Sequence, residues 1–127
     1  MKKTFLLTVC SILLVFVFFS CSHFHHGDNI SISLKDSRDA YKMTAYFNEG
    51  QTARVHKYMD EQLGRRNNFS FTNAEMDATL TLDDRTTFYI KSSPGDIEIN
   101  FDKEKNSYES YVQVKQMCEG IKTVLAK

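Results

Sequence analysis

Hydrophobic and polar residues alternate with a period of two in five stretches of the chain. The stretches are 30–35, 41–47, 76–82, 88–90 and 97–101. Strict alternation is typical of a β-strand that buries one face and exposes the other to water. The turn-prone segment 36–39 separates the first two stretches, so together they predict a β-hairpin. The pattern therefore predicts five strands.

A helical pattern follows the second stretch. Asn48 and Gln51 stand at the spacing of a capping box, and Gly64 stands where a helix would end. Between them, four apolar residues and one glutamine recur at helical spacing. These positions are Val55, Tyr58, Met59, Gln62 and Leu63. We therefore expect a first helix over Glu49–Leu63.

The C-terminal segment contains the clearest helical pattern. Asn106 and Glu109 stand at the spacing of a second capping box, and an apolar stripe begins soon after them. The stripe consists of Tyr111, Val114, Cys118, Ile121 and Leu125, with Met117 and Val124 along its edge. Cys118 lies in the middle of the stripe, so a buried hydrophobic role is favoured over that of a nucleophile.

The predicted element order is ββαβββα. The last three strands are joined by short connections at 83–86 and 93–95, and this predicts an antiparallel meander. Because every strand alternates cleanly, one face of the sheet should be solvated and both helices should cover the other. The expected fold is an α+β two-layer sandwich with a five-stranded antiparallel sheet. Its solvated face would carry Lys42, Thr44, Tyr46, Thr79, Thr81, Tyr89, Lys91, Glu98 and Asn100.

The first twenty-one residues form a segment of a different kind. Lys2 and Lys3 precede an uncharged apolar run, Phe5–Phe19, which is the layout of a secretory signal peptide. The run ends in Phe18-Phe19-Ser20-Cys21, with a small residue immediately before a cysteine. This segment resembles the lipobox of bacterial lipoproteins, although Phe18 stands where that family usually has leucine.

The resemblance implies a covalent lipid anchor. Cys21 would receive a diacylglycerol through a thioether, the bond after Ser20 would be cut, and the new amino group would be acylated with a fatty acid such as palmitate. Residues 1–20 would then be the signal peptide, 21–29 a lipidated tether and 30–127 one α+β domain. Since Ser22 follows the cysteine, we expect the outer membrane, with the domain facing the periplasm.

Two alternatives to this anchor remain open. An uncleaved helical anchor built on the fifteen-residue run would cover roughly 22 Å of a ~30 Å hydrocarbon core, which is too short to span it comfortably. In the other alternative, Cys21 is an ordinary thiol beside a simple signal peptidase site.

The composition limits which partners the mature chain can bind and whether it can form disulfide bonds. Without residues 1–20, 107 residues remain, with 14 basic and 16 acidic side chains. Such a small, mixed charge argues against nucleic acid, which requires a concentrated basic face. Cys10 would leave with the signal and Cys21 would carry lipid, so Cys118 would have no partner for an intramolecular disulfide.

Candidate chemistry is sparse in this sequence. His23, His25 and His26 are close together in the tether, but a metal site there would require ordering a short polar linker, so we predict no metal and no cofactor. Catalytic motifs such as Gly-x-Ser-x-Gly and His-Glu-x-x-His are missing. His56 should border the apolar stripe or face water, and Asp83-Asp84 matches a turn better than an acid-base pair.

Two function classes remain. The favoured one is a non-catalytic lipoprotein that binds or supports a partner protein of the cell envelope through the open sheet face or a sheet edge. The alternative is a small lipid-anchored hydrolase or metal-binding protein that uses the tether histidines or surface carboxylates. For the favoured class, the candidate binding residues are Tyr46, Tyr89, Lys42 and Lys91.

Overall fold

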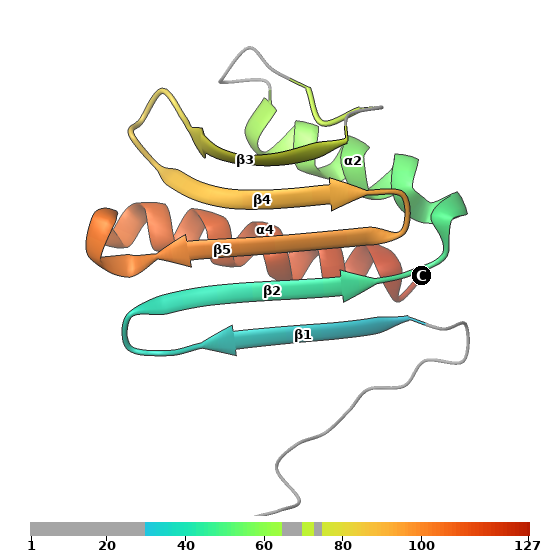
Figure 1. Cartoon of the computed structure of the whole chain (residues 1–127), viewed down its shortest axis with the longest axis horizontal. Coiled ribbons are helices and arrows are strands. Elements are labelled where there is room, and N and C mark those ends of the chain that lie inside the picture. The colour runs from blue at the N-terminus through green and yellow to red at the C-terminus, as the bar shows by residue number, and fades with distance from the viewer. Residues whose placement is uncertain (1–29, 65–69, 73–74) are drawn as a thin grey trace, which may run out of the picture.

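The computed structural model describes residues 30–64, 70–72 and 75–127, which form a sheet packed against two helices (Figure 1). The strands are β1 (Ser31–Asp36), β2 (Ala40–Tyr46), β3 (Met76–Thr81), β4 (Thr87–Ser93) and β5 (Asp96–Asp102). Helices α2 (Thr52–Met59) and α4 (Tyr108–Leu125) lie on the same side of the sheet. The predicted α+β fold, with five antiparallel strands and two helices, is confirmed.

The strands are arranged in the order β1-β2-β5-β4-β3, and every neighbouring pair is antiparallel. The last strand of the chain, β5, is therefore the central one, and its pairing with β2 joins the first hairpin to the meander. In this register Ile99 lies opposite both Met43 on β2 and Ile90 on β4. These three side chains are completely buried, so the inner face of the central strands forms the floor of the core.

The two edge strands are less well covered than the centre. Ile32 and Leu34 on β1 are only partly buried, as are Met76 and Leu80 on β3, and Ala78 is exposed. The alternating run 76–82 therefore does not bury all of its apolar residues, although the pattern had predicted that it would. Of its apolar residues only Leu82, which follows the strand, is fully buried. The helices cover the middle of the sheet and leave the inner faces of both edge strands partly open to water.

Helix α4 begins one residue later than the predicted capping box requires. Ser107 is the N-cap, and its hydroxyl accepts a hydrogen bond from the Ser110 N–H at 3.1 Å. Asn106 instead bridges to the start of β4, where its Oδ1 accepts from the Thr87 N–H and its Nδ2 donates to the Thr87 carbonyl. The apolar stripe of this helix is confirmed: Tyr111 and Val124 are partly buried and the other predicted members are fully buried.

The first predicted helix is present but is divided into three parts. A 3₁₀ turn, η2 (Glu49–Gln51), leads into α2, and a π-helical segment, η3 (Asp60–Gly64), ends it. Asn48 caps the start by accepting from the Gly50 N–H. Gln51 Oε1 is buried without a hydrogen-bond partner, so the reciprocal half of the predicted capping box is missing. Gln62 is exposed because η3 changes the helical spacing after Met59.

The two helices approach each other closely at one glycine. A Cβ atom at Gly120 on α4 would lie 1.7 Å from the hydroxyl oxygen of Tyr58 on α2. Only a residue without a side chain leaves room for the tyrosine ring at this point. Gly120 therefore sets how closely α2 and α4 can pack.

The β4–β5 turn connects the sheet to the start of α2. Gly95 has φ +76°, the left-handed value that a type II turn requires after a proline. Its N–H donates to Thr52 Oγ1 at 2.9 Å, and its carbonyl accepts from the Phe47 N–H at 2.9 Å. One glycine thus holds together the end of β2, the first residue of α2 and the hairpin.

We predict that Gly95→Ala destabilises the fold by more than the ~1–3 kcal/mol typical of backbone strain at one residue. The added Cβ would lie 2.6 Å from the Phe47 carbonyl oxygen, and the positive φ disfavours any side chain. Urea unfolding gives the free energy. Gly50→Ala is the control, because its Cβ would meet only the Asn48 side chain, at 3.3 Å. Equal losses in the two variants would contradict this role for Gly95.

Candidate binding face

The side of the sheet opposite the helices is uncovered and polar. Antiparallel pairing places its outward side chains in rows that run across the strands. One row contains Lys35, Lys42, Asn100, Tyr89 and Thr79, and the next contains Ser33, Thr44, Glu98, Lys91 and Asp77. Every residue predicted for the solvated face is exposed or partly exposed. We call this surface the open face.

The register places the four candidate binding residues separately on the open face. Lys42 and Tyr89 lie in one row with Asn100 between them, and Lys91 lies in the next row. Tyr46 lies opposite Asp96, four residues along β5 from the Asn100 row, or about 14 Å at ~3.4 Å per residue. The two tyrosines therefore do not form one aromatic cluster.

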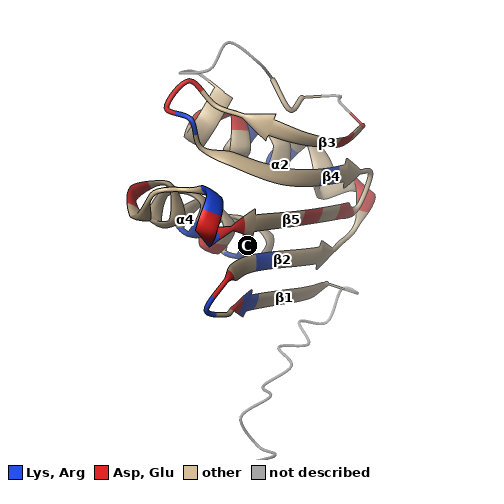
Figure 2. Ribbon diagram, turned by 60° about the vertical axis from the view of Figure 1, so that its left-hand side comes forward, with Lys and Arg blue, Asp and Glu red and all other residues tan. Residues whose placement is uncertain are grey.

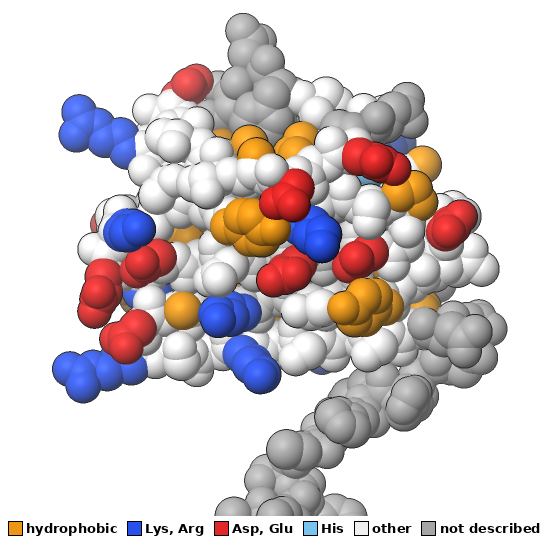
Figure 3. Space-filling model, in the orientation of Figure 1, with side chains coloured by type: hydrophobic (Ala, Val, Ile, Leu, Met, Phe, Trp, Pro, Cys, Tyr) orange, Lys and Arg blue, Asp and Glu red, His pale blue; other side chains and the backbone are white. Residues whose placement is uncertain are grey.

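Charges of both signs are interspersed over the open face (Figures 2 and 3). Lys91 lies opposite Glu98 on β5 and Asp77 on β3, and opposite charges across strands stabilise a sheet modestly. At the other edge Lys35 lies opposite Lys42, which brings two like charges together. The face is therefore neither a basic nor an acidic field.

A hydrogen bond fixes the orientation of Tyr89 on this face. Its hydroxyl donates to Asp77 Oδ1 on β3 at 2.7 Å. This hydrogen bond to a carboxylate raises the pKa of Tyr89 to about 12. The ring is thus held against the sheet as a neutral phenol.

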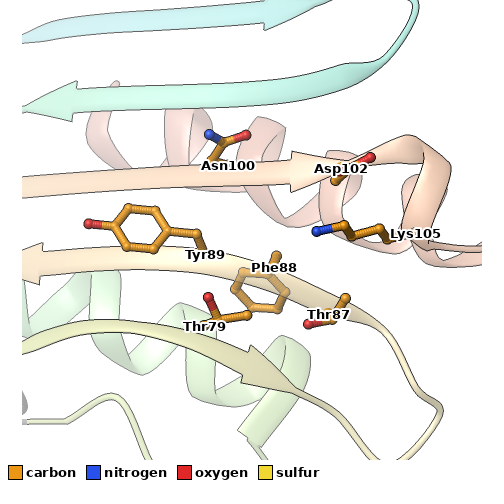
Figure 4. Close-up of a pocket in the computed structure, with 7 residues that line it drawn as sticks. All are labelled: Thr79, Thr87, Phe88, Tyr89, Asn100, Asp102 and Lys105. Atoms are coloured by element: carbon orange, nitrogen blue, oxygen red, sulfur yellow. The ribbon is translucent and has the colours of Figure 1, made fainter.

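A shallow depression of about 260 Å³ lies beside Tyr89 (Figure 4). It is formed by β3, β4, β5 and the 3₁₀ turn η4 (Lys103–Lys105) that follows β5. Its lining residues are Thr79, Thr87, Phe88, Tyr89, Asn100, Asp102 and Lys105. The Phe88 side chain is buried in the core, so the polar residues and the Tyr89 ring are the groups that a ligand could contact. Lys105 reaches back from η4 toward the strands.

A second polar cluster, which the sequence pattern did not indicate, ties the edge strand β1 to the helical layer. Asp36 Oδ1 lies 2.5 Å from Lys103 Nζ, and Oδ2 accepts from the Tyr111 hydroxyl and lies 3.5 Å from Lys115 Nζ. The hydrogen bonds from Lys103 and Tyr111 hold the pKa of Asp36 below its usual range. Lys103 Nζ also lies 4.5 Å from the Tyr111 ring centroid, in cation–π range. Each of these side chains is already paired with another member of the cluster. We therefore assign the cluster a structural role, which is to hold β1 to η4 and α4.

His56 is buried, contrary to the expectation that it borders the stripe or faces water. Only 4% of its surface is exposed, and its Nε2 lies 2.9 Å from Ser92 Oγ on β4. Burial lowers the pKa of the imidazole, although the Asp60 carboxylate opposes this. Ser92 is also buried, so this serine–histidine pair has no surface at which a substrate could reach it.

Asp60 joins the end of the first helix to the segment after it. Its carboxylate accepts hydrogen bonds from the Ser70 hydroxyl, the Phe71 N–H and the Thr72 hydroxyl, at 2.5–2.7 Å. Partial burial raises the pKa of this carboxyl, but the three hydrogen bonds outweigh burial and leave the pKa below its usual range. The Asp60 carboxylate therefore holds the backbone of Phe71, whose side chain is buried in the core.

The other candidate reactive groups are buried or used in turns. Burial raises the pKa of the Cys118 thiol to about 12, so it stays protonated and unreactive at neutral pH. Asp84 accepts from the Thr86 N–H and so forms part of the predicted turn beside Asp83. Among residues 30–64, 70–72 and 75–127, no histidine, cysteine or acidic cluster is placed to bind a metal. Cys21 and the histidines at 23, 25 and 26 lie outside the described residues.

No protein-family model, curated protein or solved structure matches this chain. Within the part of the chain that the structure describes, no helix is both long and apolar enough to cross a bilayer.

We predict that His56 makes stability depend on pH near neutrality. Because its folded-state pKa lies below the unfolded value of ~6.5, the unfolded chain binds more protons as the pH falls through this range. The stabilisation is complete above pH ~6.5 and is lost as the pH falls through the folded-state pKa. Denaturant unfolding between about pH 7 and pH 5 measures the slope.

His56→Gln should remove that slope, because the variant lacks the buried imidazole that causes it. Glutamine cannot titrate and can still form a hydrogen bond with Ser92. An unchanged pH dependence in the variant would show that His56 does not control it.

Proposed function

We propose that this chain is a lipid-anchored, non-catalytic protein of the bacterial cell envelope that binds a partner through its open face. The observation that carries the binding part is the asymmetry of the sheet: the helices cover one face, and the other presents tyrosine, threonine and charged side chains to water. The groups best suited to catalysis, Cys118 and His56, are in the core. Their burial favours binding over chemistry.

The anchoring part rests on the N-terminal sequence. Lys2 and Lys3, the apolar run Phe5–Phe19 and the Ser20-Cys21 pair favour lipidation of Cys21 in the outer membrane, with the domain in the periplasm. Residues 21–29 can extend at most about 30 Å at ~3.3–3.6 Å per residue. Because β1 begins at Ser31, the open face would act within a short distance of the membrane.

The composition of the open face limits the class of partner. Interspersed charges do not favour a polyanion such as nucleic acid. Exposed tyrosines surrounded by polar residues are common where proteins bind other molecules, because the ring offers contact area and the hydroxyl a hydrogen bond. Tyr46, with 53% of its surface exposed, is the most accessible such side chain on this face. An envelope protein or another neutral polar component is therefore the expected partner.

For the anchor, we predict that the intact mass of the mature protein equals residues 21–127 plus a diacylglycerol and a fatty acid. Two or three acyl chains hold a protein stably in a bilayer, whereas one gives marginal binding. Cys21→Ser should abolish lipid labelling and leave the precursor uncleaved. A mass matching unmodified residues 21–127, or the full chain, would rule out lipidation.

For the binding part, we predict that a photo-crosslinking amino acid in place of Tyr46 gives a discrete adduct in intact cells. The same amino acid in place of Tyr108 is the matched control, because Tyr108 is 74% exposed but belongs to the first turn of α4. Denaturing gels resolve the adducts. Equal labelling from the two positions, or none from position 46, would contradict binding through the open face.

A further inference from the structure

The depression beside Tyr89 has the features of a built subsite. The Tyr89 ring is fixed before any ligand arrives, because its hydroxyl is bonded to Asp77. Binding to it therefore requires no ordering of the side chain, which lowers the entropic cost of association. The exposed ring surface offers an apolar plane on an otherwise polar sheet.

The groups around the ring can both donate and accept hydrogen bonds. Asn100 lies directly across from Tyr89 in the register, and Asp102 follows two positions along β5. Neither the Asn100 amide nor the Lys105 ammonium forms a side-chain hydrogen bond or ion pair with another described residue. Asp102 uses Oδ1 for the Glu104 N–H, which leaves its second carboxylate oxygen as an acceptor. A ligand rich in hydroxyl groups fits this mixture, because each hydroxyl also donates and accepts.

Charge and size exclude other ligand classes. Asp102 and Lys105 balance each other, and Lys42 and Lys91 balance the nearby Asp77 and Glu98, so no excess of positive charge favours a phosphate-rich ligand. The volume of about 260 Å³ is below the ~300 Å³ at which pockets begin to enclose drug-sized ligands. The depression therefore has room for one ring of a ligand, and the rest of the ligand would lie along the sheet. An extended peptide would instead pair with a sheet edge through its backbone.

We infer that the depression binds one neutral sugar ring of a glycan chain, with its apolar face stacked on Tyr89 and its hydroxyls bonded to Asn100, Asp102 and Lys105. This inference rests on the proposed role of the open face and names the ligand class for part of it. A glycan chain running across the sheet would place its next units over the neighbouring rows of polar side chains.

Calorimetry on the full chain in detergent micelles tests this assignment. The probes are cellotetraose, which contains only neutral hexose rings, and chitotetraose, which carries the N-acetyl groups of cell-wall glycan. Co-sedimentation with purified peptidoglycan tests the cell wall itself as a source. We expect at least one tetrasaccharide to bind, and sedimentation with peptidoglycan only if chitotetraose is the one that binds.

Four variants locate the site. Tyr89→Ala should weaken binding at least about tenfold, the factor that corresponds to ~1.4 kcal/mol. Tyr89→Phe keeps the ring but loses the hydrogen bond to Asp77 that orients it, so it should weaken binding by less. Asn100→Ala should also weaken binding. Lys57→Ala, at an exposed position of α2 on the opposite side of the sheet, should leave binding unchanged. Thermal unfolding checks that each variant is folded.

Two outcomes would overturn the inference. One is no binding of either tetrasaccharide at millimolar concentration; the other is binding that survives both Tyr89→Ala and Asn100→Ala in folded protein. Either result leaves the broader proposal standing if the crosslink from position 46 is still formed. Loss of that crosslink as well would remove the open face as a binding surface.

Discussion

Burial of one face of the antiparallel sheet is the constraint on which the rest of the structure depends. The inner face of β5 carries Ile97, Ile99 and Phe101, all fully buried, and β2 and β4 extend this apolar floor on either side. The apolar stripe of α4 covers this floor together with Val55 and Met59 of α2. Removing this contact would expose the whole core to water, because the described residues contain no disulfide that could hold the sheet and helices together.

The same constraint separates structural from functional surfaces. Potentially reactive side chains that point inward, such as Cys118 and His56, are desolvated. Burial raises the pKa of the thiol and lowers the pKa of the imidazole, and both shifts favour the neutral form. Side chains on the other face remain in water and are free of packing demands. The Tyr89–Asp77 hydrogen bond orders one of them without burying it. A binding surface can therefore be built on the open face without weakening the core.

The sequence pattern predicted much of this fold because its signals are local. Alternation located the strands, and the stripe of α4 identified the residues that cover them. The pairing of β2 with β5 was not predicted, since it joins segments far apart in the chain. The roles of His56, Asp60, Asn106 and Asp36 were missed for the same reason: each depends on a partner on another element. Tyr89 was a predicted candidate, but the depression beside it was not predicted. Asn100, Asp102 and Lys105 lie near Tyr89 only because β5 pairs with β4 in this register.

The most direct test of the central claim compares lysine reactivity in isolated membranes with that of the purified chain. Lys42 and Lys91 lie on the open face, and Lys57, an exposed residue of α2, serves as the reference on the helical side. Acylation followed by peptide mass spectrometry measures each site. If the open face binds an envelope partner, Lys42 and Lys91 react more slowly in membranes than in the purified chain, while Lys57 reacts equally in both. Equal reactivity of Lys42 and Lys91 in the two preparations would contradict the account.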